Sequence, residues 1–226
     1  MCARVLVCAF ESQSVANVMK DHWTKELLIA TRNPGKVCEV EMLLEGLPLR
    51  LRSLSEFPEI VEVEETGVTF GENAALKAMA YAGQTRLWTL ADDSGLEVDA
   101  LGGAPGVFSA RYAGGACSSD AERIAQLLAE LSRTGDAKRR ARFVCVIAIT
   151  DPDAKLVNTS TGTCEGSIAF APRGTNGFGY DPVFIPDGYQ QSFGELSPHI
   201  KQRISHRARA LEAARPFLIK YSQDTA

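Results

Sequence analysis

The chain has 226 residues, of which 45% are hydrophobic and 23% charged, values close to the average of globular domains. A chain of this length fits one ordinary domain with a sizeable core, so extensive disorder is excluded. The net charge of −4 argues against a non-specific nucleic-acid binder, which normally carries an excess of basic residues. No apolar run approaches the roughly 18 residues that span a bilayer, so we expect no membrane partner.

The beginning of the chain differs from the rest. We expect residues 1–22 to form a dispensable N-terminal tail and residues 23–226 to form a single domain. Val5 to Phe10 supplies six consecutive apolar residues, fewer than the roughly 7–15 of a signal-peptide core, so an over-long start is favoured over a signal peptide. The six cysteines are scattered without a C-x-x-C pair, which is typical of a reduced, cytoplasmic protein without disulfides or a zinc ribbon.

The first half of the chain predicts two strands and two helices. Asn33-Pro34 combines a helix cap with proline at the first helical position, and Thr69 followed by Glu72 is a capping box. The expected elements are a buried strand at 27–31, a helix from Pro34 with its apolar face running to Leu47, an alanine-rich helix from 70 to about Gly83, and a strand at 87–91 that ends directly before Asp92-Asp93.

The second half predicts strands in pairs between helices. The expected elements are a helix capped at Ser119, paired strands at 143–150 and 156–164, a short strand at 183–185, a turn of helix at Ser197-Pro198 and a last helix from Ser205 to Leu218. Strands mixed with amphipathic helices indicate an α/β fold with a mixed β-sheet.

A first candidate site lies between the first strand and the first helix. Its residues are Thr31, Arg32, Asn33, Pro34, Gly35 and Lys36. Free backbone N–H groups, the positive end of the helix dipole and a nearby lysine would form a phosphate cradle, although this is no Walker A loop. A plain capped helix with a solvated lysine is an equally good interpretation of this spacing alone.

A second candidate site is acidic. Glu62, Glu64 and Glu65 precede the second helix, and Asp92-Asp93 ends a strand, where α/β proteins place their ligand crevice. Two or three such carboxylates would suit Mg²⁺, which takes one or two protein carboxylates together with substrate phosphates. Taken alone, a solvated glutamate run and a turn are the commoner interpretation.

Two further segments lie in the last quarter of the chain. In Phe178-Gly179-Tyr180-Asp181 the glycine permits close backbone approach and an aromatic ring could stack on a base, although core packing is the commoner use of such rings. Lys201 and His206-Arg207 lie near helix starts and could bind anions, while solvated surface charge is the default interpretation. Neither His199 nor His206 has a partner at zinc-ligand spacing.

In this order the motifs resemble one family, the inosine triphosphate pyrophosphatases, also called dITP/XTP pyrophosphatases. The resemblance runs from about Glu26 to about Leu218. Its five blocks are T-x-N-x-x-K at 31–36, E-E-T-G-x-T-F-x-E-N-A-x-x-K-A at 64–78, A-D-D-S-G-L at 91–96 with the glycine-rich segment and S-A-R-Y that follow to 112, F-G-Y-D-P at 178–182, and I-S-H-R at 204–207. No block departs from the pattern that the family uses.

The resemblance implies roles for individual residues. Residues 31–36 would hold the triphosphate, with Lys77 as a further phosphate contact and Ser94 touching substrate. Asp93 would be the general base and, with Glu64 or Glu65, would bind Mg²⁺; spacing favours Glu65. Those that would surround base and sugar are Phe178, Gly179, Tyr180, Asp181, Lys201, His206 and Arg207.

The resemblance also implies a fold and an activity. The family fold is an elongated α/β protein with an active-site cleft between two lobes, usually a homodimer. The expected activity is Mg²⁺-dependent hydrolysis of ITP, dITP and XTP to the monophosphate and pyrophosphate, which cleanses the nucleotide pool. The alternatives are a related pyrophosphatase for pyrimidine or modified nucleotides and a non-catalytic nucleotide-binding module, which would need no paired carboxylates.

Overall fold

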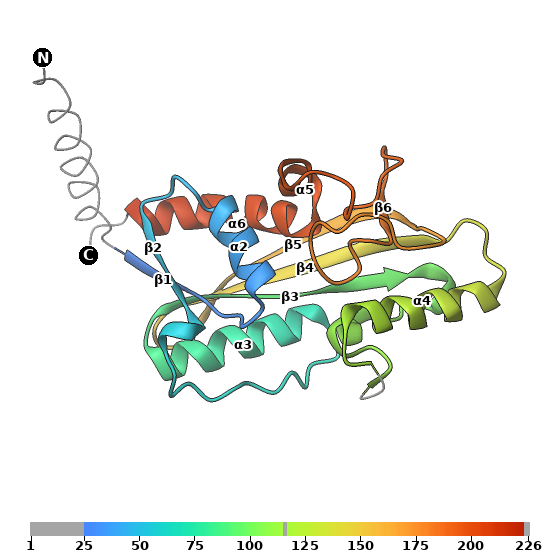
Figure 1. The fold of residues 1–226 in the computed structure, drawn as a ribbon. Helices are drawn as coiled ribbons and strands as arrows, with labels where there is room; N and C mark the ends of the chain where they lie inside the picture. Colours follow the sequence, from blue (N-terminus) through green and yellow to red (C-terminus); the bar gives the residue numbers. More distant parts are fainter. Residues whose placement is uncertain (1–24, 115–116, 224–226) are drawn as a thin grey trace, which may run out of the picture.

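The fold is built on one six-stranded sheet (Figure 1). The computed structural model describes residues 25–114 and 117–223, so the expected tail at 1–22 lies outside the described residues. The strands are β1 (Lys25–Ile29), β2 (Leu49–Ser53), β3 (Trp88–Val98), β4 (Arg140–Thr150), β5 (Leu156–Ile168) and β6 (Phe184–Pro186). The helices are α2 (Pro34–Leu43), α3 (Phe70–Thr85), α4 (Asp120–Thr134), α5 (Pro198–Ile204) and α6 (His206–Gln223), with 3-10 turns η2 (Leu54–Glu56), η3 (Asp99–Leu101) and η4 (Gly106–Arg111).

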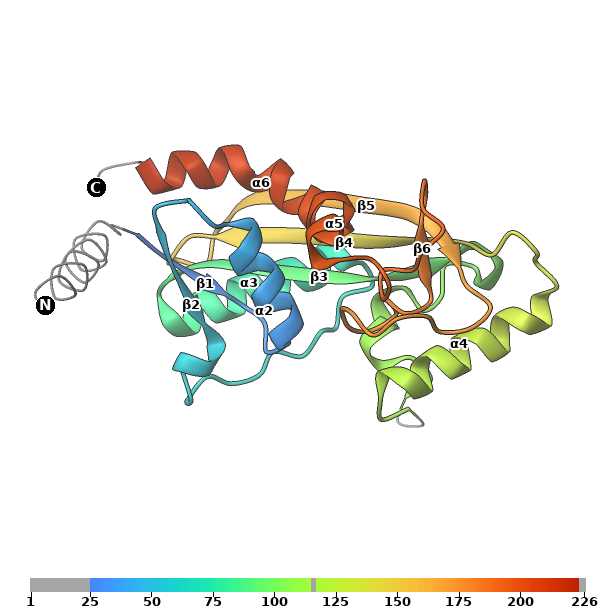
Figure 2. The same ribbon diagram turned by 45° about the horizontal axis from the view of Figure 1, so that its top comes forward.

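The strand order β2-β1-β3-β4-β5-β6 makes the sheet mixed. β1 pairs in parallel with β2 and β3, whereas β3, β4, β5 and β6 are antiparallel neighbours. The long strands β3, β4 and β5 run the length of the molecule and make it elongated, as the two views in Figures 1 and 2 agree. The predicted α/β fold with a mixed sheet is therefore confirmed.

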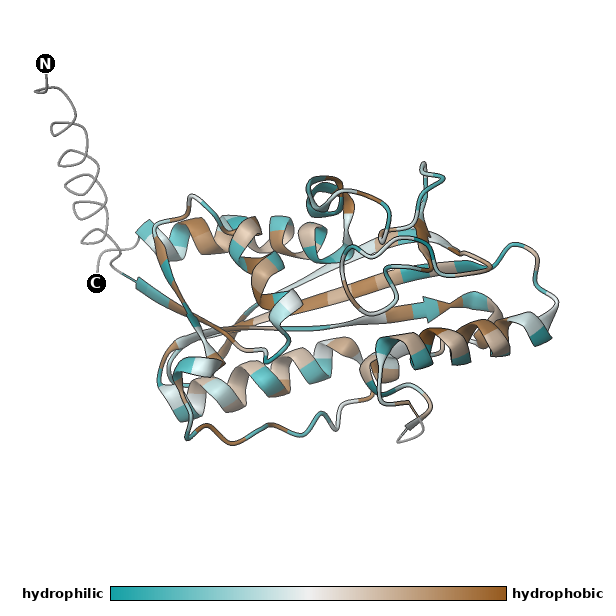
Figure 3. Ribbon diagram, viewed as in Figure 1, coloured by the Kyte–Doolittle hydropathy of each residue, from teal (hydrophilic) through white to brown (hydrophobic). Residues whose placement is uncertain are grey.

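The side chains of β1 point alternately to the two faces of the sheet, and helices cover both faces. Leu27 and Ile29 pack with α2 and α6 on one face, while Leu28 and Ala30 pack with α3 on the other. A third apolar cluster joins α4 to the far end of β3–β5 and to the loop around β6. Figure 3 shows hydrophobic stretches both on the strands and on the helices that cover them. Within the described residues no helix is both long and apolar enough to cross a bilayer.

Two of the predicted helix starts are confirmed by their capping hydrogen bonds, whereas Ser197 precedes α5 without a side-chain cap bond. The Asn33 side chain accepts from the N–H groups of Gly35 and Lys36, and the Thr69–Glu72 pair forms a complete capping box. α3 ends at Thr85, slightly beyond the predicted stop, because Arg86 adopts the left-handed conformation (φ 58°) and donates its N–H to the Ala82 carbonyl.

One predicted boundary is wrong in a way that matters for the site. The strand expected to end before Asp92 continues to Val98, because β4 pairs with β3 continuously from Thr89 to Val98. Asp92 and Asp93 therefore lie inside a strand, and their side chains point to opposite faces of the sheet.

Candidate active site

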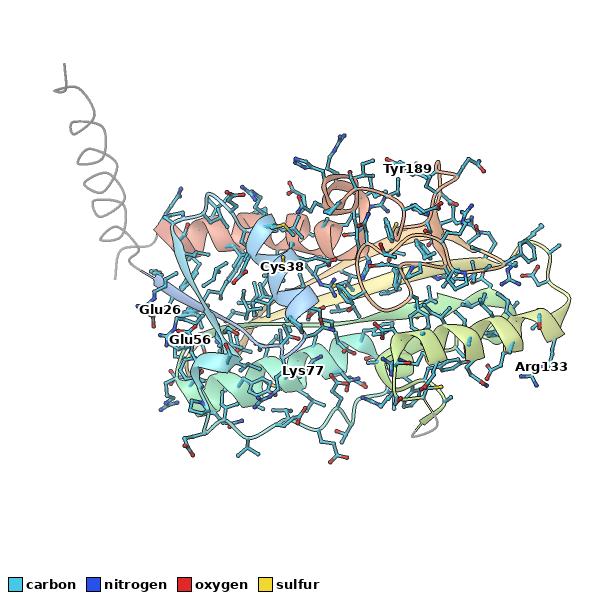
Figure 4. All side chains as sticks on the ribbon, in the orientation of Figure 1. Glu26, Cys38, Glu56, Lys77, Arg133 and Tyr189 are labelled. Carbon is cyan, nitrogen blue, oxygen red and sulfur yellow. The ribbon has the colours of Figure 1, made fainter. Side chains whose placement is uncertain are left out.

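The site forms where β3 loses one of its neighbours. β1 pairs with β3 only as far as Ile29 opposite Leu90, so β3 has an open edge from Ala91 to Gly95, beyond which residues 104–109 cover it. Strand alternation then sends Asp92 toward α2 and α6 and Asp93 toward α3. Figure 4 labels Cys38 on α2 and Lys77 on α3, on opposite sides of these central strands. Side chains from both faces can therefore meet at one opening.

Asp93 belongs to a group on the α3 side that we call the outer cluster. Its members are Glu65, Lys77, Asp93 and Arg111. Lys77 Nζ bridges two carboxylates, at 3.0 Å from Asp93 Oδ1 and 2.9 Å from Glu65 Oε1. Arg111 donates to Glu65 Oε2 at 2.8 Å, and the buried Asn73 amide donates to Asp93 Oδ2 at 3.3 Å. Two carboxylates thus share one cation at the edge of β3.

Asp92 belongs to a second group, the inner cluster, on the opposite face. Its members are Lys36, Glu39, Asp92, Asp181, Lys201 and Arg207. Arg207 donates to Asp92 Oδ2 at 2.8 Å and also to Glu39, while Lys36 Nζ lies 3.1 Å from Asp92 Oδ2. Lys201 pairs with Glu39 at 2.7 Å and with Asp181. The three carboxylates and three cations balance one another in a nearly dry environment.

The two adjacent aspartates have opposite pKa shifts. Burial alone would raise the pKa of Asp92, but Lys36 and Arg207 outweigh it and hold that pKa well below its usual range. Burial raises the pKa of Asp93 above its ordinary value, although Lys77 and Lys36 oppose the shift. Asp92 is therefore a fixed anion, whereas Asp93 is the more basic carboxylate of the two.

His206 lies beside the inner cluster without joining its ion pairs. Its ring stacks on Phe143 with centroids 4.6 Å apart, and its Nδ1 is buried without a hydrogen-bond partner in the described structure. Burial, followed by the nearby charges of Arg207 and Lys201, lowers its pKa well below 6.5. The imidazole is therefore neutral at pH 7 and keeps an unused polar atom.

The start of α2 differs in one respect from the predicted phosphate cradle. The N–H groups of Gly35 and Lys36 are not free, because the Asn33 side chain accepts from both, at 2.9 and 3.2 Å. The helix dipole and the Lys36 ammonium remain as the positive features at this end of the site.

Two cavities meet at Phe178. One, of about 400 Å³, is lined by the α2 start, by Asp93, by α4 and by residues 178–181 and 206–207. Its lining includes residues 33–36 and Glu65 from one side and Asp120, Arg123 and residues 178–181 from the other, which agrees with the expected cleft. The other, of about 350 Å³, has an apolar wall including Met42 and Leu196. Phe178 lines both, and its ring packs so closely on Gly35 that a Cβ there would lie 2.5 Å from it.

Comparison with known proteins identifies the family. The family model described as the Ham1 family matches residues 27–217. The chain belongs to the Ham1 family. It is 50% identical over 194 residues to the dITP/XTP pyrophosphatase of Synechococcus sp. (strain CC9311), covering 86% of this chain and 90% of that protein. It is 49% identical over 188 residues to the dITP/XTP pyrophosphatase of Bacillus anthracis, covering 83% and 93%.

Solved structures agree with this assignment. A HAM1 protein from Coxiella burnetii is similar with a TM-score of 0.79 at 44% identity, covering 87% of this chain and 100% of that chain. A nucleoside-triphosphatase / dITP/XTP pyrophosphatase from Mycobacterium abscessus is similar with a TM-score of 0.67 at 46% identity, covering 84% and 99%. The resemblance inferred from the sequence motifs is therefore confirmed at the level of family and fold.

Most of the predicted site residues come together around the larger cavity. Those that line it are Asn33, Pro34, Gly35, Lys36, Glu65, Asp93, Ser94, Phe178, Gly179, Tyr180, Asp181, Lys201, His206 and Arg207. Lys77 is buried and pairs with Glu65 and Asp93, which line the cavity, but is not itself in the lining. Thr31 accepts a hydrogen bond from the Asn33 N–H, and Arg32 is exposed and donates to the Ile60 carbonyl. Glu64 is exposed and lies outside this lining.

Several residues of the site are absent from the sequence prediction. Glu39 lies one helical turn after Lys36, and this spacing on one helix face could have indicated it. Asn73 lies in the predicted block at 64–78, four residues before Lys77. Asp120 and Arg123 of α4 line the larger cavity, and Asp120 accepts the N–H of Gly179 at 2.8 Å. No local pattern links α4 to residue 179, because only the fold brings them together.

Proposed function

We propose that the chain is a nucleoside triphosphate pyrophosphohydrolase that converts dITP, ITP and XTP to the monophosphate and pyrophosphate. Membership of the Ham1 family and about 50% identity to proteins named dITP/XTP pyrophosphatase support this activity. The observation that carries it is the outer cluster, in which two carboxylates share a lysine beside a cavity large enough for a nucleotide. A non-catalytic binding module has no need of such a pair.

The two cavities suggest where each part of the nucleotide binds. The apolar wall of the smaller cavity, with Glu39 and Lys201 at its edge, suits a heteroaromatic base. The larger cavity, with Lys36 and the α2 N-terminus, suits the sugar and the triphosphate. Phe178 stands between them, where its ring can stack on the base.

Asp93 is the residue that we assign as general base. Its pKa is raised by burial, which makes its carboxylate a better proton acceptor than an exposed aspartate. Lys77 and Asn73 hold its two oxygens, and a carboxylate has further lone pairs for a water molecule. The water oxygen attacks the α-phosphorus, its proton passes to Asp93, and the bond to the bridging oxygen breaks to release pyrophosphate.

Glu65 and Asp93 fit a hard divalent cation. Their oxygens face each other across Lys77, and Mg²⁺ needs only one or two protein carboxylates. Among the described residues no group of three or more metal-ligating side chains occurs, so substrate oxygens and water would complete the shell. When bound, Mg²⁺ supplies positive charge for the departing pyrophosphate and lowers the pKa of water. We propose Glu65 rather than Glu64 as the partner of Asp93.

The remaining residues divide into positioning and binding roles. Arg207 is 1% exposed and its donors already reach Asp92, Glu39 and Ser94, so we assign it to holding the inner cluster together. His206 lines the larger cavity, and we assign it to the binding of substrate there. A site that hydrogen-bonds one group rejects an analogue lacking that group by as much as about 10⁴-fold.

A hydrolysis panel tests the proposal. We expect ITP, dITP and XTP to release pyrophosphate in the presence of Mg²⁺, with ATP, UTP and dTTP at least about 100-fold slower in kcat/KM. Omission of Mg²⁺ should abolish turnover. Release of orthophosphate in place of pyrophosphate would contradict the assigned bond cleavage, and a preference for UTP or dTTP would favour a pyrimidine pyrophosphatase.

We further propose that the protein acts as a homodimer in the cytoplasm and that residues 1–22 are dispensable, with 23–226 as the working domain. The resemblance to the family and the scattered cysteines support these assignments. Light scattering after size exclusion tests the dimer. Deleting residues 1–22 should change kcat/KM by less than about twofold, because termini without docking contacts contribute little. A larger loss would show that these residues belong to the enzyme.

A further inference from the structure

Glu65 is carried by a segment that has no regular structure. Residues 61–68, which we call the strap, join η2 to α3 and run alongside α3 as an irregular trace in Figure 1. Within the described part of the chain the strap forms no backbone–backbone hydrogen bond. Backbone groups need partners, so the position of the strap depends on side chains that reach it.

Most of those side chains come from α3, and Arg111 of η4 adds a bond to the Glu65 carbonyl at 3.3 Å. Gln84 makes two bonds to a single residue: its Oε1 accepts the Val61 N–H at 2.8 Å, and its Nε2 donates to the Val61 carbonyl at 3.2 Å. At the other end of the strap, Asn73 Oδ1 accepts the Gly67 N–H at 2.8 Å. Four pairs join alternate strap residues to α3: Val61 to Gln84, Val63 to Tyr81, Glu65 to Lys77 and Gly67 to Asn73. At the end of the strap next to the helix, Val68 also donates its N–H to the Glu72 side chain, at 2.7 Å.

The spacing of the paired residues along the strap fits the spacing of their partners along α3. The strap residues alternate with period two, as in an extended chain, and the α3 residues recur at helical spacing along one stripe. Residues of the other parity, Glu62 and Glu64 among them, are exposed. A slip of one residue would therefore bring Glu64 or Thr66 to Lys77 and remove Glu65 from the site.

Gln84 is the residue that best defines this register. It binds both the N–H and the carbonyl of one peptide residue, so it fixes the orientation of the backbone as well as its distance. Lys77 contacts the Glu65 carboxylate, and Arg111 contacts both that carboxylate and, at 3.3 Å, the Glu65 carbonyl. Both are long side chains, which can follow a displaced residue. Gln84 lies two helical turns from Lys77, roughly 10 Å along the axis, and therefore outside the reacting groups.

We propose that Gln84 is a positioning residue: by clamping Val61 it sets the register of the strap on α3 and so places Glu65 beside Asp93. This inference rests on the proposed function, because it takes Glu65 to be a ligand of the divalent cation. Gln84 itself touches neither substrate nor cation. Its removal should weaken cation binding while the fold stays intact.

The test measures Mn²⁺ affinity without nucleotide, together with kcat and KM for ITP. Direct partners of metal ligands change affinity by about 10–100-fold, so the more distant Gln84→Ala should weaken Mn²⁺ binding by roughly three- to tenfold. Gln84→Glu keeps an acceptor for the Val61 N–H but loses the donor, so it should lie between wild type and Gln84→Ala. Gln223→Ala, at the exposed end of α6, is the matched control and should behave as wild type.

A double-mutant cycle separates this role from a general effect on folding. If Gln84 acts through Glu65, then Gln84→Ala should have little further effect on Mn²⁺ affinity or kcat in a Glu65→Gln background. An equal effect in both backgrounds overturns the inference, as does unchanged Mn²⁺ affinity in Gln84→Ala. The proposed function fails separately, if the wild-type protein binds Mn²⁺ but releases no pyrophosphate from ITP.

Discussion

The inner and outer clusters begin at neighbouring residues of β3, yet their surroundings differ. Asp92 is 2% exposed and meets Lys36 and Arg207, which are carried by α2 and α6. Asp93 meets Lys77 from α3 and, through it, Glu65 on the strap. The inner cluster is therefore carried by helices and β3 except for Asp181, which lies in a turn, and the outer cluster takes one of its two carboxylates from the strap.

This difference teaches how one strand can give two carboxylates different tasks. Alternation places the two side chains on opposite faces, and the surroundings then move their pKa values apart. Environments that separate the pKa values of adjacent acids commonly divide their roles in catalysis. Asp92 is suited to permanent charge and positioning, while Asp93 is suited to proton transfer.

The largest expected effect is on turnover, at Asp93. Asp93→Asn should lower kcat for ITP by about 10²–10⁴-fold, because an amide accepts no proton from water. Its free energy of unfolding should stay equal or rise, because burial already disfavours the charged form. Pyrophosphate release and urea denaturation measure the two quantities. Near-wild-type turnover would remove Asp93 from the role of base.

The same substitution at Asp92 should act mainly on stability. Asp92→Asn leaves the buried Arg207 and the partly buried Lys36 without their shared anion, and breaking a buried pair on one side costs about 3–5 kcal/mol of unfolding free energy. Urea denaturation of the two asparagine variants compares the clusters directly. Equal stability of both would contradict the division between an inner anchoring cluster and an outer reacting one.

A third comparison lies on the strap, between Glu65 of the outer cluster and the adjacent Glu64. Glu65→Gln should weaken Mn²⁺ binding by at least about tenfold, whereas Glu64→Gln, which points to solvent, should change it by less than about twofold. Titration calorimetry with Mn²⁺ measures both, with each variant as the control for the other. The reverse order would mean that the strap binds α3 in the other register.

These glutamates also show where sequence reasoning stops. The motif predicts that one of them is used, and spacing favours Glu65, but the strap is neither strand nor helix and has no periodicity of its own to decide. Which alternate residues of the strap face α3 is decided by tertiary contacts with Asn73, Lys77, Tyr81 and Gln84. The capping signals at Asn33 and Thr69, by contrast, act over three residues and predict their helices correctly.

Buried charge is the other feature that the sequence hides. Asp92 is adjacent to the predicted base, yet nothing local tells that β3 continues and that the two side chains separate. Arg207 carries a motif signal that suggests a substrate contact, and only the fold reveals that its donors already meet Asp92, Glu39 and Ser94. The motifs predict which residues belong to this site, whereas the pairing of the strands determines which residues they contact.

The smallest expected effect is the contribution of His206, beside the inner cluster, to the pH dependence of the unfolding free energy. Its pKa in the folded protein lies well below the unfolded value of 6.5, because burial and then the cations Arg207 and Lys201 disfavour a further positive charge. Above pH 6.5 both states are neutral at this residue, and its contribution to stability is fully present. As pH falls below 6.5, only the unfolded state takes up the proton, so stability is lost.

One unmatched proton corresponds to about 1.4 kcal/mol per pH unit, so wild type should lose about that much unfolding free energy through His206 between pH 7.5 and pH 5.5. His206→Phe, which preserves a ring against Phe143, should remove this part of the pH dependence. His199→Gln, at an exposed position on α5, controls for the loss of an imidazole elsewhere. Urea denaturation at the two pH values gives the difference for each protein. If wild type and His206→Phe lose the same stability on acidification, then the inner side accepts the extra charge, and the contrast between a charge-balanced inner cluster and a proton-exchanging outer cluster does not hold.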